Sequence, residues 1–214
     1  MLSKRGTLAI LTLALGVSTL AALTVRAGLG LESAESDNSG NTFTTAPSFT
    51  STGYLGPSGQ AADTGGNNDG FELNPTYAYG DDLLYATNAD GAGDQHRSYN
   101  YGISLPSGST VEGIRVRLDW WVDDGGGDNS MSVELSSNGG STWTAAKTDA
   151  VESTSEHTSV LGGAADIWGR IWTPDDLSDA NFVVRLTCGC TGVGCGSRDF
   201  YLDWVAVSVY YTPP

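Results

Sequence analysis

Four tryptophans could form an exposed aromatic platform for a ligand. An indole face buries a large apolar area against a flat ligand such as a sugar ring, and Trp121, Trp143, Trp168 and Trp172 are the candidates. We predict Trp121, Trp168 and Trp172 as ligand-binding residues. The alternative for each is packing inside the fold. Trp121 is the best exposed candidate, because its neighbour Trp120 takes the inward position of the same strand.

Three cysteines, Cys188, Cys190 and Cys195, lie close together near the end of the chain. An exported protein should oxidise such thiols. Because three is an odd number, we expect one disulfide and one free or intermolecular thiol, with Cys195 paired to Cys188 or Cys190 as a staple of this loop. A zinc site would need a fourth ligand, and the sequence shows none nearby.

Catalytic motifs are absent from the sequence. The two histidines, His96 and His157, are far apart, and neither has the spacing of a metal site or a catalytic triad. No G-x-S-x-G, H-E-x-x-H or phosphate-loop pattern occurs. The many carboxylates stand in turn sequences, where Asp is favoured without any catalytic reason. We therefore predict that the chain is not an enzyme.

The composition is acidic and rich in turn formers. The net charge is -15, from 25 acidic and 10 basic residues, and such a surface repels phosphate backbones, so we exclude nucleic acid as a partner. An acidic surface keeps a protein soluble, and it also suits cation binding or a salty medium. The 29 glycines, with many Ser, Thr, Asn and Asp residues, favour an all-β protein with many turns.

Residues 1–27 predict a signal peptide or an N-terminal membrane anchor. Two basic residues precede Thr7–Val25, a run of uncharged residues typical of an export signal, and Val25–Ala27 could be its cleavage site. The run is also long enough for an uncleaved anchor. Ser3–Gly6 resembles a type IV pilin processing site, although Leu11 stands where Glu is expected. All three interpretations place the rest of the chain outside the cytoplasm, in the extracellular space or at the cell surface.

Residues 28–70 predict a flexible linker, because Ser, Thr, Gly and Asn dominate and no apolar period persists. Within it, Phe49–Leu55 could add an edge strand. Asp63–Gly70 offers oxygens that suit calcium, but it lacks the spacing of an EF-hand loop, so a plain loop is the favoured interpretation.

Residues 71–214 predict the folded domain. Apolar residues alternate most clearly along Val111–Val122, which places Trp120 inside, and the same pattern returns in Val205, Val207 and Val209. Thr173–Asp176 predicts one short helix or 3₁₀ turn. Repeated short strands with one buried face require two packed sheets. The predicted fold is all-β, a two-sheet antiparallel β-sandwich (jelly-roll-like), preceded by an N-terminal hydrophobic helix and a flexible linker.

Four separated blocks resemble a β-sandwich module of bacterial exported proteins and phage structural proteins. The blocks are Asn74–Thr87, Tyr101–Val116, Ile167–Phe182 and Leu202–Thr212. No activity is assigned to that module, and the Cys188–Cys195 insertion departs from it. The order of elements also resembles jelly-roll, galactose-binding-like domains, in which an early loop and a carboxylate of the last strand can hold a structural calcium ion.

That resemblance implies Asp81, Asp82 and Asp203 as ligands of a structural Ca²⁺. Asp203 shares the alternation of Val205 and Val207, so we expect it to point inward. A buried carboxylate is costly unless it is hydrogen-bonded, paired or metal-bound. The alternative to calcium is therefore a structural carboxylate that accepts hydrogen bonds from the N–H groups of a neighbouring loop.

From these observations we predict an exported, non-catalytic β-sandwich module with a structural or adhesive role at the cell surface. Its partner would be a surface glycan or a protein, and self-association is a further option. Contact with a membrane is expected only through the N-terminal segment. One alternative is a carbohydrate-binding, lectin-like module with structural calcium, and another is a subunit of a pilus-like extracellular filament.

Overall fold

A computed structural model describes residues 49–214 of the chain. The predicted leader, the N-terminal hydrophobic helix and the first part of the predicted linker lie outside the described residues. Within residues 49–214, no helix is both long enough and apolar enough to cross a membrane.

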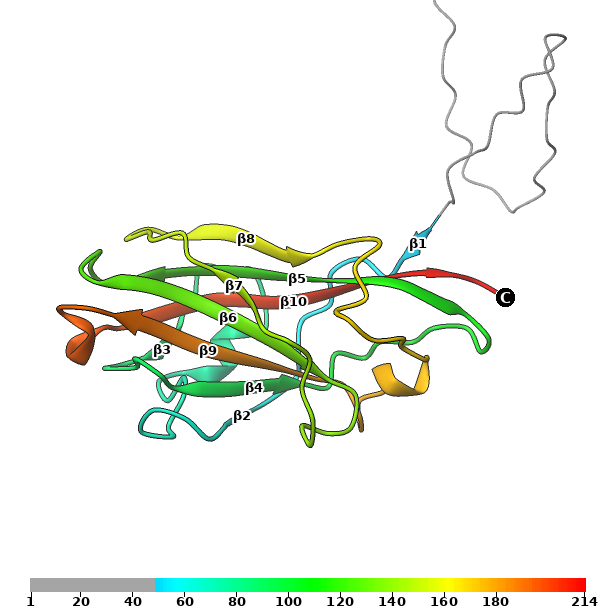
Figure 1. The fold of residues 1–214 in the computed structure, drawn as a ribbon, viewed down its shortest axis with the longest axis horizontal. Helices are drawn as coiled ribbons and strands as arrows, with labels where there is room; N and C mark the ends of the chain where they lie inside the picture. The colour runs from blue at the N-terminus through cyan, green and yellow to red at the C-terminus, as the bar shows by residue number, and fades with distance from the viewer. Residues whose placement is uncertain (1–48) are drawn as a thin grey trace, which may run out of the picture. The chain divides into compact units, whose positions relative to one another are not determined.

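The described residues form two antiparallel sheets that pack face to face (Figure 1). The first sheet has the order β1-β10-β5-β8, and β3 also pairs with β10. Its strands are β1 (Thr50–Ser51), β3 (Ala86–Asn88), β5 (Thr110–Val122), β8 (His157–Gly162) and β10 (Phe200–Thr212). The second sheet, in the order β2-β4-β9-β6-β7, consists of β2 (Gly59–Ala62), β4 (Gln95–Tyr99), β6 (Asp128–Ser136), β7 (Lys147–Asp149) and β9 (Val183–Thr191). The predicted all-β, two-sheet antiparallel sandwich is confirmed.

The core lies between the two sheets and is filled by alternate side chains of their central strands. The apolar side chains of β5 that the alternation predicted to face inward are all fully buried: Ile114, Val116, Leu118, Trp120 and Val122. Asp119, on the other face, is fully buried as well. Strand β10 lies antiparallel to β5 and buries Val205, Val207 and Val209 as predicted. The second sheet contributes Met131, Val133, Val184 and Leu186. Each large aliphatic side chain contributes roughly 1.5–3 kcal/mol of hydrophobic free energy when it is fully buried.

Two short strands lie inside the range predicted as linker. Strand β1 pairs with the end of β10, and β2 pairs with β4 at an edge of the second sheet. These pairings place residues of the sandwich before the predicted boundary at residue 71. The strands are held mainly by backbone hydrogen bonds and their side chains are partly or fully exposed, so they leave no apolar alternation in the sequence.

The opposite edge of the sandwich places β7 beside β8. There the carboxylate of Asp149 accepts a hydrogen bond from Trp120 Nε1 at 2.8 Å and contacts His157 Nε2 at 2.9 Å. Burial raises the pKa of Asp149, but the hydrogen bonds from His157 and Trp120 outweigh burial and leave the pKa below its ordinary value. Because Trp120 and His157 belong to the first sheet and Asp149 to the second, this contact ties the two sheets together.

Three 3₁₀ helices complete the described elements, at Pro75–Ala78, Asp175–Leu177 and Cys195–Ser197. The second of them confirms the short turn predicted from Thr173–Asp176. The Thr173 hydroxyl accepts the backbone N–H of Asp176 at 3.2 Å, which is how a capping side chain satisfies a free donor at the start of a helix.

Candidate functional site

A cavity of about 310 Å³ lies close to the edge formed by β7 and β8. It is lined by the end of β6, by the segment leading into β7 and by the loop after β8. The aromatic and polar lining residues are Thr142, Trp143, Thr144, Trp168 and Arg170, and the others are Leu135, Ala145 and Gly169. The volume is at the lower end of the range for small-ligand sites.

Trp168 is fixed in the cavity wall by its backbone and by its indole nitrogen. Its Nε1–H donates to the carbonyl oxygen of Ile114 at 2.9 Å, and its backbone N–H donates to Asp166 Oδ1 at 2.9 Å. Its φ of +54° lies in the left-handed region, which is unfavourable for a bulky residue. The conformation persists because these hydrogen bonds and the burial of the ring hold it.

Lys147 and Asp166 lie behind the Trp168 ring. Lys147 Nζ is 2.8 Å from Asp166 Oδ2 and 5.1 Å from the centre of the Trp168 ring. The ammonium group lowers the pKa of Asp166 below its ordinary value, because it forms a hydrogen bond to the ionised carboxylate. The cation therefore contacts both the acid and the indole, and it contributes to the position of the ring.

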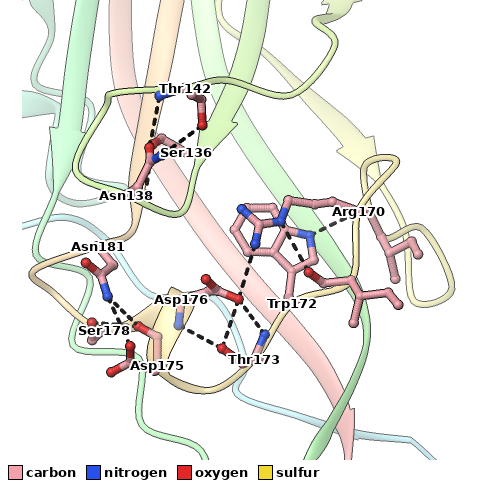
Figure 2. A network of polar contacts seen from close by, with 12 residues as sticks. Ser136, Asn138, Thr142, Arg170, Trp172, Thr173, Asp175, Asp176, Ser178 and Asn181 are labelled. Carbon is pink, nitrogen blue, oxygen red and sulfur yellow. Dashed lines mark hydrogen bonds and ion pairs between the residues drawn. The ribbon is translucent and has the colours of Figure 1, made fainter.

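Trp143 is carried by a turn at Asn138-Gly139. The Asn138 side chain accepts the backbone N–H of Thr142 at 2.9 Å and donates to the Thr142 hydroxyl at 2.9 Å, and Ser136 Oγ donates to Asn138 Oδ1 at 2.9 Å (Figure 2). Gly139 has φ of +67°, which favours glycine. These contacts fix where the chain enters the cavity wall.

The Trp143 ring packs against two guanidinium groups of the second sheet. The Cζ atoms of Arg185 and Arg97 are 4.2 Å and 5.6 Å from the centre of the ring. Each arginine is also ion-paired, Arg185 to Glu134 at 2.6 Å and Arg97 to Asp63 at 2.6 Å. Cation–π contacts of this kind contribute roughly 0.5–2 kcal/mol each. They hold the indole in place although it is not part of the buried core.

Arg170 is held on top of Trp172. Its Cζ is 4.5 Å from the centre of the indole, and its Nη2 is 3.3 Å from Asp176 Oδ2 (Figure 2). Asp176 is itself fixed by the backbone N–H and the hydroxyl of Thr173, at 2.8 Å and 2.9 Å. Trp172 is only 2% exposed and donates its Nε1–H to the carbonyl oxygen of Ile167. The arginine therefore occupies a defined position in the cavity wall.

The lining combines apolar ring surface with hydrogen-bonding side chains. The Thr142 and Thr144 hydroxyls and the Arg170 guanidinium supply the polar groups, and the two indoles supply the apolar surface. Binding sites for small molecules have this composition, with a few fixed polar groups among apolar ones. A ligand with one apolar face and a polar rim fits such a lining.

No protein-family model matches the chain. No curated protein matches it either. Its similar solved structures contain carbohydrate-binding modules. One is the CBM22-1 and GH10 part of the Clostridium thermocellum endo-1,4-beta-D-xylanase 10B with xylohexaose, with a TM-score of 0.36 and 14% identity. The match covers 73% of this chain and 26% of that one, so this chain matches about a quarter of the xylanase polypeptide.

Two further structures are single modules. The CBM32 of AlyQ with 4,5-unsaturated mannuronic acid has a TM-score of 0.36 and 12% identity, covering 72% of this chain and 96% of that one. The CBM6cm-2 module of Cellvibrio mixtus lichenase 5A with cellotriose has a TM-score of 0.29 and 13% identity, covering 59% and 90%. With TM-scores below 0.5, these likenesses carry no argument about what this chain binds.

Two of the three tryptophans predicted as ligand-binding lie at the cavity. Trp168 lines it and Trp172 supports Arg170 from beneath. Trp121 lies elsewhere, on the outer face of the first sheet, where its ring stacks on Tyr201 with 4.0 Å between centres and 10° between planes. Tyr85 packs edge-on against Trp121 at 5.6 Å. We call Tyr85, Trp121 and Tyr201 the outer aromatic cluster. Tyr201 covers one face of the Trp121 ring, which stays partly exposed, and the ligand-binding role of Trp121 stays a prediction.

Sequence reasoning missed Arg170, Thr142 and Thr144 as site residues. Arginine and threonine are common surface residues, so their type alone carries no signal. Arg170 stands next but one to Trp172 and follows Trp168 by two positions in the same stretch. An arginine between two tryptophans was the one pattern that could have suggested it.

Asp203 is fully buried, as expected, and lies at a β-bulge between Leu202 and Trp204. Its contacts are those of the predicted alternative to calcium, a carboxylate that accepts hydrogen bonds from a neighbouring loop. Its two carboxylate oxygens accept the backbone N–H groups of Asp82 at 3.2 Å and Leu83 at 3.1 Å. The side chain therefore anchors the loop that crosses it. Burial and the charges of the nearby carboxylates raise its pKa.

The predicted calcium ligands do not form a ligand set in this arrangement. Both oxygens of Asp203 are hydrogen-bonded to backbone, and Asp81 Oδ2 is paired with Arg117 at 2.9 Å. Across residues 49–214, no group of three or more His, Cys, Asp or Glu side chains is placed to hold a metal ion. The Ca²⁺ role of Asp81, Asp82 and Asp203 stays a prediction, and chelation tests it.

The cysteines and the buried histidine have structural surroundings. Cys190 and Cys195 form the disulfide, which settles one of the two expected pairings, and Cys188 is free and buried. Burial raises the pKa of the Cys188 thiol far above its ordinary value. His96 accepts the backbone N–H of Phe71 at its Nδ1, and burial lowers its pKa to about 4. Neither group is poised for reaction at neutral pH.

Proposed function

We propose that the sandwich is a non-catalytic carbohydrate-binding module and that the cavity between Trp143, Trp168 and Arg170 is its binding site. One observation carries the proposal: two indoles from different segments line one cavity of about 310 Å³ together with hydroxyl and guanidinium groups. The site residues are held by ion pairs and hydrogen bonds, so little ordering remains to oppose binding.

A sugar ring suits this lining better than a purely apolar or a purely ionic ligand. The C–H face of a pyranose is apolar and packs on an aromatic face, while its hydroxyl groups lie around the rim. Thr142, Thr144 and Arg170 line the same cavity and support the proposal, because their side chains can hydrogen-bond to sugar hydroxyls. A purely apolar ligand would leave these polar groups desolvated and unpaired, which costs free energy.

The wider roles expected from the sequence remain proposals alongside this one. Export, display at the cell surface and an adhesive role agree with glycan binding, because a glycan of a surface or matrix would be the partner. Self-association and a pilus-like filament depend on the N-terminal segment. They are tested by identifying the mature N-terminus by mass spectrometry.

The decisive experiment is a glycan array with the full chain, followed by calorimetry with the best ligand. Trp143→Ala should weaken binding roughly tenfold or more, about 1.4 kcal/mol, because truncation of a central aromatic side chain removes its packing surface. Trp121→Ala is the matched control, since it removes an indole that does not line the cavity. We expect the control to bind like the wild type.

Two outcomes would contradict the proposal. If the chain binds no oligosaccharide on the array, carbohydrate binding is excluded. Equal loss of binding in both tryptophan variants, with unchanged thermal unfolding, would move the site away from the cavity.

A further inference from the structure

The polar side chains that line the cavity are two hydroxyls, which both donate and accept, and one guanidinium, which only donates. Thr142 Oγ1 already accepts from Asn138 Nδ2, and Thr144 Oγ1 accepts from the backbone N–H of Leu135. Within residues 49–214 neither hydroxyl donates a hydrogen bond, so the hydrogen of each is free for a ligand. Arginine has donors only.

Arg170 keeps part of its guanidinium uncommitted. Its Nε–H donates to the carbonyl oxygen of Ile171 at 3.2 Å, and Nη2 makes the 3.3 Å contact with Asp176. In the part of the chain that the structure describes, Nη1 has no hydrogen-bond or ion-pair partner. The indole N–H of Trp143 also has none there. The lining residues therefore include several hydrogen-bond donors that have no acceptor among the described residues.

No carboxylate or amide side chain lines the cavity, although the chain has 25 acidic residues. The acids near the site, Asp166 and Asp176, are paired with Lys147 and Arg170 and are not among the lining residues. A neutral sugar presents hydroxyl groups, each of which brings a donor that needs an acceptor. A carboxylate brings acceptors alone, and one of its oxygens can accept from Nη1, the Arg170 nitrogen without a partner among the described residues.

We infer that the cavity takes an acidic sugar, a uronic acid whose ring lies against the indoles and whose carboxylate is bound by Arg170. This inference rests on the proposed function and names its ligand class. The net charge of -15 opposes an anion only weakly, because at physiological ionic strength charges farther than about 8 Å from the ligand are largely screened. At contact distance the donors of the cavity determine the preference.

The test compares acidic and neutral forms of the same oligosaccharide. Calorimetry with the full chain measures binding of galacturonate and mannuronate trimers and of their carboxyl-reduced galactose and mannose counterparts at physiological salt. We expect at least one acidic trimer to bind roughly tenfold or more tightly than its neutral counterpart, as for a charge-assisted hydrogen bond.

Variants of Arg170 separate the carboxylate contact from the rest of the site. Arg170→Gln should abolish the preference for the acidic trimer and leave the weaker binding of the neutral trimer. Arg170→Lys should keep only part of the preference, since lysine keeps the charge but does not place an N–H donor where Nη1 lies. Arg115→Gln is the control, because Arg115 stacks on Tyr210 and does not line the cavity.

The outcomes distinguish this inference from the proposed function. If neutral trimers bind as tightly as acidic ones and binding depends on Trp143, the acidic ligand class is wrong and carbohydrate binding stands. If the preference for acid survives in Arg170→Gln, the assignment of the carboxylate to Arg170 is wrong. If neither these trimers nor any glycan on the array binds, both conclusions fail together.

Discussion

The two groups of aromatic residues in this sandwich are used in different ways. At the cavity each tryptophan contacts a cation: Arg185 lies over Trp143, Lys147 over Trp168 and Arg170 over Trp172. In the outer aromatic cluster the rings contact one another, with Trp121 and Tyr201 stacked at 4.0 Å. At the cavity Trp168 and Trp172 are buried and Trp143 is partly exposed, whereas all three rings of the outer aromatic cluster are partly exposed.

The difference follows from where the residues stand in the chain. Trp121 and Tyr201 are direct cross-strand partners on β5 and β10, so the sheet register brings their rings together. Trp143 and Trp168 stand in connecting segments outside the named strands, where no register supplies a neighbour. Their partners are charged side chains of nearby strands and loops. A regular sheet favours mutual packing of aromatic residues, whereas loops at its edge can hold them apart.

The largest effect that would sharpen this comparison is on stability. Trp168→Ala should lower the free energy of unfolding by about 3–5 kcal/mol, because Trp168 is only 4% exposed and its Nε1–H satisfies the Ile114 carbonyl. Trp143→Ala should cost much less, since that ring is outside the buried core. Urea unfolding measures both, and equal losses would contradict the distinction between the two cavity tryptophans.

A smaller effect concerns the outer aromatic cluster. A double-mutant cycle of Trp121→Ala and Tyr201→Ala should give a coupling free energy of about 0.5–1.5 kcal/mol, because the stacked pair stabilises the fold beyond the burial of each ring. The same variants should leave glycan binding unchanged. Additive losses of stability, without coupling, would show that the rings are merely close.

The pH dependence of stability should have opposite signs for Asp166, near the cavity, and for Asp203, on β10. The pKa of Asp166 is lowered in the folded state, so its contribution is present above about pH 4 and is lost as the pH falls through the folded pKa. The pKa of Asp203 is raised, so stability falls as the pH rises from about 4 through the folded pKa.

Asparagine variants isolate the two pH effects. Asp166→Asn should be less stable than the wild type at neutral pH, and this difference should disappear on acidification. In Asp203→Asn the loss of stability that the wild type shows as the pH rises should be absent. Thermal unfolding between pH 3 and 7 measures both variants. The Asp166 effect should be small, because that side chain and its Lys147 partner are each about a third exposed and solvent screens the pair. Slopes of the same sign would refute the contrast.

The smallest expected effect is that of chelation. Because backbone N–H groups occupy both oxygens of Asp203, we expect EDTA to leave the Tm unchanged. A fall of several degrees that added Ca²⁺ reverses would correspond to about 1–2 kcal/mol for a chain of this size, and it would favour the predicted calcium role of Asp81, Asp82 and Asp203.

Much of the fold follows from local patterns. The alternation along Val111–Val122 and Val205–Val209 predicts which faces are buried, because side chains of a strand point to opposite sides in turn. The bulge between Leu202 and Trp204 was not predicted. The edge strand expected within Phe49–Leu55 is present as β1, whereas β2 was missed, because its pairing depends on backbone groups that every residue has.

The candidate site was predictable only in part. Trp168 and Trp172 stand out by residue type, but the cavity exists because residues 142–145 meet residues 168–170 in space. That meeting depends on how β7 lies beside β8, which no local pattern encodes. Arg170 is recognisable as a site residue only when its neighbours in space are known.

The pairing of β1 with the end of β10 has a consequence for architecture. Thr50 lies opposite Tyr211, so the polypeptide enters and leaves the sandwich at almost the same place. A module with adjacent ends can be spliced into a loop of another protein without separating the flanking parts of its host. It can equally be permuted, with Thr50 joined to Thr212 through a short connector. Segments joined to Thr50 and to Thr212 would therefore start from neighbouring points of the sandwich.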